Sequence, residues 1–132
     1  LLDESNNKIH FIDYEYAGPN QQLFDIANHL CEYAGVDEPN YEKDGPTNNE
    51  REYLLKCYFF HFLGKPLDEL ELKNLLNQLI IFESASHFFW TLWAIHQANL
   101  SKIQFDYMQY AITRHKQFNL IFNKYKQQNI KK

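Results

Sequence analysis

The 132-residue chain has only two cysteines, no long apolar run and no excess of basic residues. Cys31 and Cys57 both lie in helical patterns rich in large apolar residues, which indicates reduced thiols rather than a disulfide framework. No apolar stretch approaches the roughly 18 residues of a membrane span. The first residues also lack the basic start of a signal peptide. We therefore expect a cytosolic protein.

The charge balance excludes one class of partner. The net charge is −4, and no basic cluster precedes the scattered lysines near the end of the chain. A nucleic-acid surface is therefore not expected. What the chain does have is 45% hydrophobic and 17% aromatic residues, enough to build the core of one domain.

The N-terminal residues are predicted to form a β-hairpin. A strand at Leu1–Leu2 is turned by residues 5–8 into a second strand over Lys8–Tyr14, whose aromatic and β-branched side chains favour extended backbone. The turn residues Gly18-Pro19-Asn20 end this run. Because the chain starts abruptly in a strand and without Met, we expect it to be a piece of a longer polypeptide.

Two acids lie at the end of the second predicted strand. Asp13 and Glu15 are two residues apart, so on an extended backbone their carboxylates point to the same side. Two like charges on one face repel each other unless a cation lies between them, and oxygen ligands suit a hard ion such as Mg²⁺. The alternative is that both acids are simply solvated, which from spacing alone is the commoner case.

The rest of the chain is predicted to be helical. Apolar residues recur at helical spacing, and a capping box at Thr47 to Glu50 and a glycine at Gly64 mark helix ends. The side chains of Ser84-Ala85-Ser86 are small, so a bend or a tight helix crossing is expected there. The predicted helical segments are Phe24 to Gly35, Glu50 to Leu63, Leu67 to Asn99 as one helix or two, and Phe105 to Gln127.

The first of these helices carries a polar face. Asp25, Asn28, His29 and Glu32 recur at three- and four-residue spacing. A polar face on an otherwise apolar helix suggests a site. The alternative is that Asp25 bonds backbone amides at the helix start and that Glu32 faces water.

The chain's two tryptophans form a second candidate feature. Trp90 and Trp93 are three residues apart and so lie on the same helix face. Indole faces are the best cation–π partners for an ammonium ligand. The alternative is that both rings are ordinary core residues.

Three segments together resemble the choline and ethanolamine kinase family. Residues 12–16 (IDYEY), Asn20 and residues 24–32 (FDIANHLCE) are similar to the family signature, roughly IDFEY, then N, then FDIGNHF-x-E. Residues 85–94 (ASHFFWTLWA) are similar to the family's A-S-H-F-x-W-x-L-W segment. The resemblance covers almost the whole chain, from Ile9 to about Tyr125. It implies a mainly α fold (α+β), the helical C-terminal lobe of a protein-kinase-like phosphotransferase with an N-terminal β-hairpin.

In this family the catalytic loop and the nucleotide-binding lobe precede such a hairpin. The chain has no Gly-rich phosphate loop, no strand lysine that pairs with phosphates and no catalytic-loop aspartate, all of which phosphoryl transfer normally needs. We therefore expect residues 1–132 to be a single C-terminal-lobe domain that is inactive on its own. The catalytic base is expected upstream, outside this chain.

The activity that the resemblance implies is ATP-dependent phosphorylation of the hydroxyl of ethanolamine or choline. This reaction lies on the route to phosphatidylethanolamine or phosphatidylcholine, the Kennedy pathway. The implied cofactor is Mg²⁺, with ATP as co-substrate. The implied partners are ATP and the amino-alcohol, without nucleic acid or a transmembrane segment and with a homodimer as an open alternative.

The resemblance also implies roles for individual residues. Asp13 aligns with the family's magnesium-binding aspartate, and Glu15 with the acid that helps to hold a second ion. Asp25 resembles a structural acid that braces the catalytic loop, and Asn28 and His29 match signature positions to which we assign structural roles. The implied substrate-binding residues are Glu32, facing the ammonium group, and the pocket aromatics Trp90, Trp93, Phe105 and Tyr110.

The residues after Glu32 favour ethanolamine over choline. They read Tyr33-Ala34-Gly35-Val36, close to the E-F-A-G-V of ethanolamine kinases. Choline kinases usually carry a Trp directly after this Glu and a Tyr five residues after it, where this chain has Tyr33 and Asp37. A primary ammonium offers three donors and favours carboxylates, whereas a trimethylammonium has none and favours aromatic faces.

Two other classes of function compete with this interpretation. A non-catalytic helical module could bind ammonium groups or a partner helix through the aromatic residues, with no need for Asp13 or Mg²⁺. A phosphotransferase of the same fold acting on an antibiotic or a sugar would share the acids but is not expected to carry the tryptophan pair.

Overall fold

The computed structural model describes residues 2–129, with side chains through residue 127. Within this range the chain is mainly α-helical, with one small antiparallel sheet, which confirms the predicted fold class. Leu1, part of the first predicted strand, lies outside the described residues. The elements are β1 (Leu2–Asp3), β2 (Lys8–Ile9), α1 (Gln22–Cys31), the 3₁₀ helix η1 (Glu32–Ala34), α2 (Asn48–Leu63), α3 (Glu69–Leu100) and α4 (Tyr107–Asn129).

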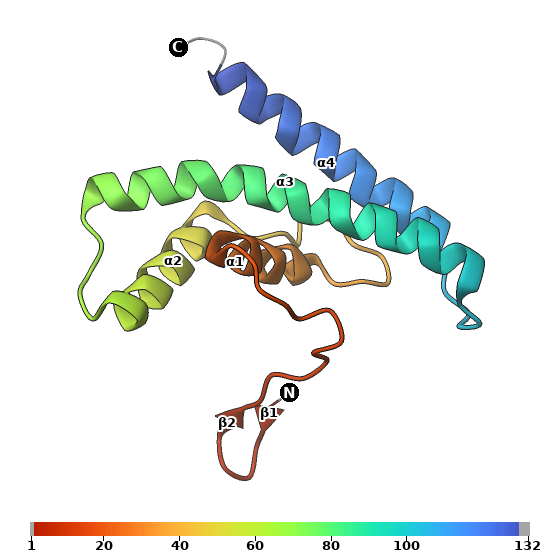
Figure 1. The fold of residues 1–132 in the computed structure, drawn as a ribbon, viewed down its shortest axis with the longest axis horizontal. Coiled ribbons are helices and arrows are strands. Elements are labelled where there is room, and N and C mark those ends of the chain that lie inside the picture. The colour runs from red at the N-terminus through yellow and green to blue at the C-terminus, as the bar shows by residue number, and fades with distance from the viewer. Residues whose placement is uncertain (1, 130–132) are drawn as a thin grey trace.

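The long helix α3 is the centre of the fold (Figure 1). The helices α1 and α2 pack against one side of it, and α4 packs against it over part of its length and then diverges toward the C-terminus. The N-terminal hairpin projects away from the helices. None of the helices within residues 2–129 is long and apolar enough to cross a membrane.

The helix ends follow the capping signals in the sequence. The Thr47 side chain accepts a hydrogen bond from the Glu50 backbone, and the Glu50 side chain accepts one from the Thr47 backbone, so the predicted capping box is confirmed. Gly64 ends α2 in the left-handed conformation, with φ of 70°, which glycine adopts without strain. The start of α3 has a second capping box between Asp68 and Glu71.

The predicted long helix is one continuous helix, α3. Its small residues lie where α1 and α4 pack closely against it. Ser84 and Ser86 are buried in the middle of α3. The Ser84 hydroxyl donates to the Phe118 carbonyl of α4 (3.4 Å), and the Ser86 hydroxyl donates to Asn28 of α1 (2.9 Å). Larger side chains here would push both neighbouring helices away from α3.

Two groups of buried apolar residues form the core. The larger lies between α1, α2 and α3, and its fully buried members include Leu30, Leu55 and Leu79. The smaller lies between α3 and α4, where Ala94 and Ala111 pack with Tyr110. The half-buried rings of Trp90, Trp93 and Phe105 pack against this second group.

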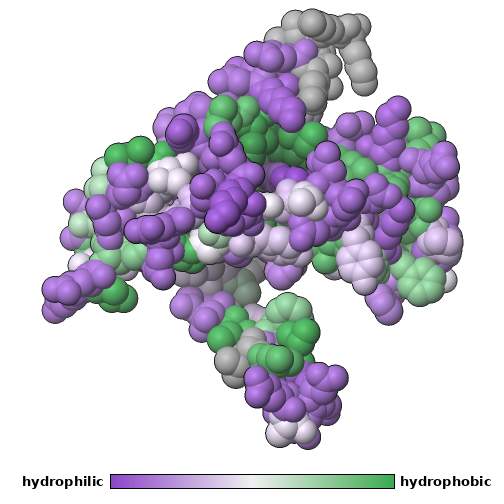
Figure 2. Space-filling model, turned by 180° about the vertical axis from the view of Figure 1, so that it is seen from behind, coloured by the Kyte–Doolittle hydropathy of each residue, from purple (hydrophilic) through white to green (hydrophobic). Residues whose placement is uncertain are grey.

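The second strand is shorter than predicted. It covers Lys8–Ile9 rather than Lys8–Tyr14, because β1 offers only the partners Leu2 and Asp3. No further strand is assigned over residues 10–21 of the described chain. The side chains of Phe11 and Ile12 are 77% and 55% exposed. Apolar side chains are visible on this projecting segment in Figure 2.

Candidate functional site

The two tryptophans of α3 lie ring to ring. Their ring centroids are 5.2 Å apart in an edge-to-face arrangement. The indole N–H of Trp90 donates to Asn28 Oδ1 at 2.6 Å, and Ser86 donates to the same oxygen. Asn28 on α1 therefore holds the Trp90 indole against α3.

Tyr16 joins this pair from the irregular N-terminal segment. Its hydroxyl accepts a hydrogen bond from the Trp93 indole at 2.9 Å, and its ring meets the edge of Trp90 at 6.1 Å. The sequence placed Tyr16 in the family-signature segment 12–16 but assigned it no part in the site. Since Tyr16 lies three residues after Asp13, the contact ties the acid-bearing segment to the tryptophans.

Aromatic contacts continue from Trp93 to α4. The Tyr107 ring lies 5.7 Å from Trp93 and 4.9 Å from Phe105. Phe105 in turn lies 5.7 Å from Tyr110. We call these residues the aromatic cluster: Tyr16, Trp90, Trp93, Phe105, Tyr107 and Tyr110. It contains the four aromatic residues to which the family resemblance gives a substrate-binding role, Trp90, Trp93, Phe105 and Tyr110.

Glu32, the fifth predicted substrate residue, meets the cluster through an arginine. Arg114 of α4 is fully buried, and its Nη1 lies 3.5 Å from Glu32 Oε1. The guanidinium carbon also lies 5.5 Å from the centre of the Tyr110 ring. Burial raises the pKa of the Glu32 carboxyl, while the nearby arginine charge opposes this rise. The Glu32 side chain keeps 38% of its surface exposed, so it can still meet a ligand.

The acids Asp13 and Glu15 are exposed and do not lie on a strand. Asp13 has φ of 63°, a left-handed conformation, so the same-side argument based on an extended backbone is wrong here. This turn lies four residues after the end of β2 at Ile9. Within residues 2–129 no group of three or more His, Cys, Asp or Glu side chains could hold a metal ion.

The remaining predicted residues of α1 lie at its surface. Asp25 in the first turn and His29 in the last are both exposed. His29 meets the Tyr33 ring edge to face at 5.7 Å. The polar face predicted for this helix therefore divides: Asn28 turns toward α3, Glu32 meets Arg114 of α4, and Asp25 and His29 are exposed.

A buried polar group that the sequence did not reveal lies behind Glu32. Cys31 Sγ is 3.6 Å from His87 Nε2, and the Tyr41 ring meets the His87 ring edge to face at 4.7 Å. Burial raises the pKa of the Cys31 thiol to about 12, so this cysteine is not a reactive nucleophile. The pKa of His87 falls to about 3, first because of burial and second because of the Arg114 charge.

This histidine is expected to make stability depend on pH. Below about pH 6.5 His87 binds a proton in the unfolded chain but stays neutral in the folded protein. The free energy of unfolding therefore decreases as the pH falls from about 6.5 toward 3. The slope from this one group is at most about 1.4 kcal/mol per pH unit. Urea unfolding at pH 7 and pH 5 should show this loss, and His87→Gln should reduce it. His29→Gln, at an exposed position, is the control; equal pH dependence in wild type and His87→Gln would contradict the assignment.

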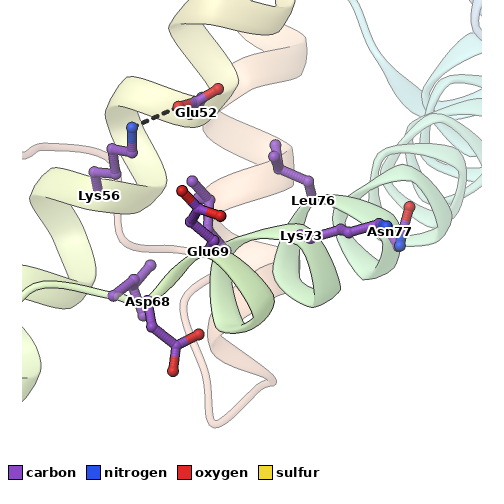
Figure 3. Close-up of a pocket in the computed structure, with 9 residues that line it drawn as sticks. Glu52, Lys56, Asp68, Glu69, Lys73, Leu76 and Asn77 are labelled. Carbon is purple, nitrogen blue, oxygen red and sulfur yellow. Dashed lines mark hydrogen bonds and ion pairs between the residues drawn. The ribbon is translucent and has the colours of Figure 1, made fainter.

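A hollow in the surface lies away from the aromatic cluster. It lies between α2 and the start of α3 (Figure 3). Its lining includes Lys56, which pairs with Glu52, and the helix cap Asp68. These charged side chains already have partners. The hollow lies at the N-terminal end of α3, whereas the tryptophans lie in its C-terminal part.

Comparison with known proteins places the chain in a family. The sequence model of "Choline/ethanolamine kinase" matches residues 1–119. The chain belongs to the choline/ethanolamine kinase family. This membership confirms the resemblance seen in the residues 12–32 and 85–94.

Several curated relatives carry names that agree with this family. The chain is 40% identical over 118 residues to "Ethanolamine kinase 2" of Mus musculus, covering 89% of this chain and 30% of the relative. It is 42% identical over 121 residues to "Ethanolamine kinase" of Drosophila melanogaster, covering 89% and 23%. It is 36% identical over 127 residues to "Probable choline kinase 1" of Arabidopsis thaliana, covering 89% and 35%. The chain thus spans about a third or less of the length of these choline/ethanolamine kinases.

Proposed function

We propose that the protein carrying this chain transfers the γ-phosphoryl group of ATP to the hydroxyl of ethanolamine. The observation that carries the proposal is the aromatic cluster, which Arg114 joins to the partly exposed Glu32. Aromatic faces attract an ammonium group, and a carboxylate supplies the opposite charge. Membership of the choline/ethanolamine kinase family supports the same chemistry.

At the substrate end, each predicted residue has a proposed part. Glu32 pairs with the ammonium group, and Trp90, Trp93, Phe105 and Tyr110 surround it. Asn28 holds the Trp90 indole through its amide oxygen. We assign Asp25 and His29, both exposed on α1, to contacts with parts of the protein outside this chain.

At the phosphate end, we propose that Asp13 binds Mg²⁺ and that Glu15 helps to hold a second ion. The donor set fits such ions, because Mg²⁺ is usually held by one or two carboxylates, with the remaining ligands from phosphates and water. The exposure of both side chains leaves room for those further ligands. When bound, Mg²⁺ neutralises charge that develops on the transferring phosphoryl group.

The substrate preference is proposed from the region that follows Glu32. Tyr33 is 42% exposed and Asp37 is exposed, so an aromatic and a carboxylate at the surface replace the two aromatics usual in choline kinases. A primary ammonium gains more from an additional carboxylate than a trimethylammonium does. Choline is the second candidate substrate, and the relative named "Probable choline kinase 1" keeps it in consideration.

The finer setting of the reaction is also a proposal. Cys31 and Cys57 are both free thiols, which supports a reducing, cytosolic location. The product would enter the Kennedy pathway to phosphatidylethanolamine. The homodimer stays a prediction.

ATP consumption by the full-length protein tests this proposal. Ethanolamine and choline are supplied in parallel, each with and without Mg²⁺. The expected result is Mg²⁺-dependent turnover that is faster with ethanolamine. A preference for choline would overturn the substrate assignment alone, whereas no turnover with either alcohol would favour a non-catalytic ammonium-binding module.

A further inference from the structure

Arg114 is a charge buried in the centre of the fold. Its side chain has no exposed surface, and burying a charge is costly unless it is well paired. Nη1 donates to the Tyr41 hydroxyl at 2.8 Å and lies 3.5 Å from Glu32 Oε1. The guanidinium carbon lies 5.6 Å from the centre of the Tyr41 ring and 5.5 Å from that of Tyr110. One cation on α4 thus contacts three residues: Glu32 of η1, Tyr41 of the loop before α2, and Tyr110 of the aromatic cluster.

The pairing of this arginine is incomplete for a purely structural residue. Its Nε and Nη2 atoms are buried and find no hydrogen-bond partner among residues 2–129. Each unsatisfied buried donor costs roughly 1–3 kcal/mol. An apolar residue of similar volume would often stabilise such a position as well or better. Stability alone therefore does not explain an arginine here.

A second arginine in the same chain shows what a satisfied structural pair looks like. Arg51 of α2 meets Glu83 of α3 through two parallel bonds, Nε to Oε1 at 2.6 Å and Nη2 to Oε2 at 2.9 Å. Its Nη1 donates to the Pro46 carbonyl. The Glu83 side chain is only 5% exposed, whereas that of Glu32 is 38% exposed. Both oxygens of the Glu83 carboxylate are bonded to Arg51. The Glu32 carboxylate contacts Arg114 but remains accessible to a ligand.

From this contrast we infer that Arg114 is a positioning residue that sets the place of Glu32 and of the Tyr110 ring relative to each other. The inference rests on the proposed function, since it makes both groups part of the ammonium site. Because a primary ammonium needs a well-placed carboxylate more than a trimethylammonium does, Arg114 also supports selectivity for ethanolamine. The Arg114 charge also lowers the pKa of the Glu32 carboxyl against the rise that burial causes, which favours the ionised carboxylate that an ammonium group needs.

The test compares Arg114→Met with Arg51→Met in the full-length protein. Arg114→Met is expected to raise KM for ethanolamine about tenfold or more, a loss of about 1.4 kcal/mol of binding. KM for ATP should stay unchanged and kcat should change little. The ratio of kcat/KM for ethanolamine to that for choline should fall. Arg51→Met should lower the unfolding midpoint but leave both KM values and this ratio unchanged.

Arg114→Lys provides a second variant that keeps the charge. It should give a KM between those of wild type and Arg114→Met, because lysine supplies a point charge without the planar fork. If Arg114→Met does not fold, a raised KM in Arg114→Lys carries the same conclusion. One result would overturn the inference: an Arg114 variant that folds, is less stable than wild type, and keeps both the KM for ethanolamine and the ethanolamine-to-choline ratio of kcat/KM unchanged. If wild type turns over neither alcohol, the proposed function fails, and this inference fails with it.

Discussion

Replacing Asp13 by asparagine is expected to lower kcat for phosphoryl transfer about a thousandfold or more, with almost no loss of stability. Asp13 is exposed, so its side chain contributes little to packing. Its φ of 63° is a conformation that aspartate and asparagine tolerate better than most residues. Asp13→Asn therefore removes the charge that would hold Mg²⁺ and keeps the backbone. The measurement is kcat over a range of Mg²⁺ concentrations, together with the unfolding midpoint.

Two further variants sharpen the Asp13 experiment. Asp13→Ala should lose the same activity and, in addition, roughly 1 kcal/mol of stability from left-handed backbone strain. Glu38→Gln neutralises another exposed acid in a loop and should leave kcat unchanged. Wild-type activity with an unchanged Mg²⁺ requirement in Asp13→Asn would remove Asp13 from the metal site.

Replacing Trp93 or Trp90 by alanine is expected to raise KM for the amino-alcohol about thirtyfold. The estimate takes a desolvated cation–π contact as about 2 kcal/mol. Trp90→Ala should also lower stability, because it removes the 2.6 Å hydrogen bond that the Trp90 indole donates to Asn28 Oδ1. Steady-state kinetics with the alcohol and with ATP as varied substrate measures both KM values, and only that for the alcohol should rise.

A phenylalanine of the same helix provides the control for the tryptophans. Phe88 of α3 packs against Phe118 of α4 at 5.1 Å, on a different part of the helix surface from the aromatic cluster. Phe88→Ala should lower the unfolding midpoint and leave KM unchanged. If the tryptophan variants behave in the same way, both indoles belong to the core and not to a substrate site.

Local signals in the sequence predicted the helices well. The capping box at Thr47 and the glycine at Gly64 mark the ends of α2 because each acts within one turn of the chain. The spacing of Trp90 and Trp93 predicted their shared face for the same reason. Their grouping with Phe105 and Tyr110, which the structure makes through the Tyr107 ring, was expected from the family resemblance and not from spacing, because these residues lie beyond the end of α3.

The features that the sequence did not reveal depend on distant contacts. In the sequence Arg114 stands among other polar residues of α4. Its spacing does not reveal the hydrogen bond to Tyr41, which lies 73 positions earlier. The hydrogen bond of Tyr16 to Trp93 spans 77 positions. The left-handed turn at Asp13 was missed because strand propensity at residues 11–16 suggests extended backbone, while β1 provides no partner there.

A competition assay tests the central claim most directly. The full-length protein is given ATP, Mg²⁺ and equal concentrations of ethanolamine and choline, and the two phosphorylated products are quantified while little of either alcohol has been consumed. The product ratio then equals the ratio of the two kcat/KM values. We predict an excess of phosphoethanolamine that disappears without Mg²⁺. An excess of phosphocholine would contradict the ethanolamine assignment, and formation of neither product would contradict the proposed activity itself.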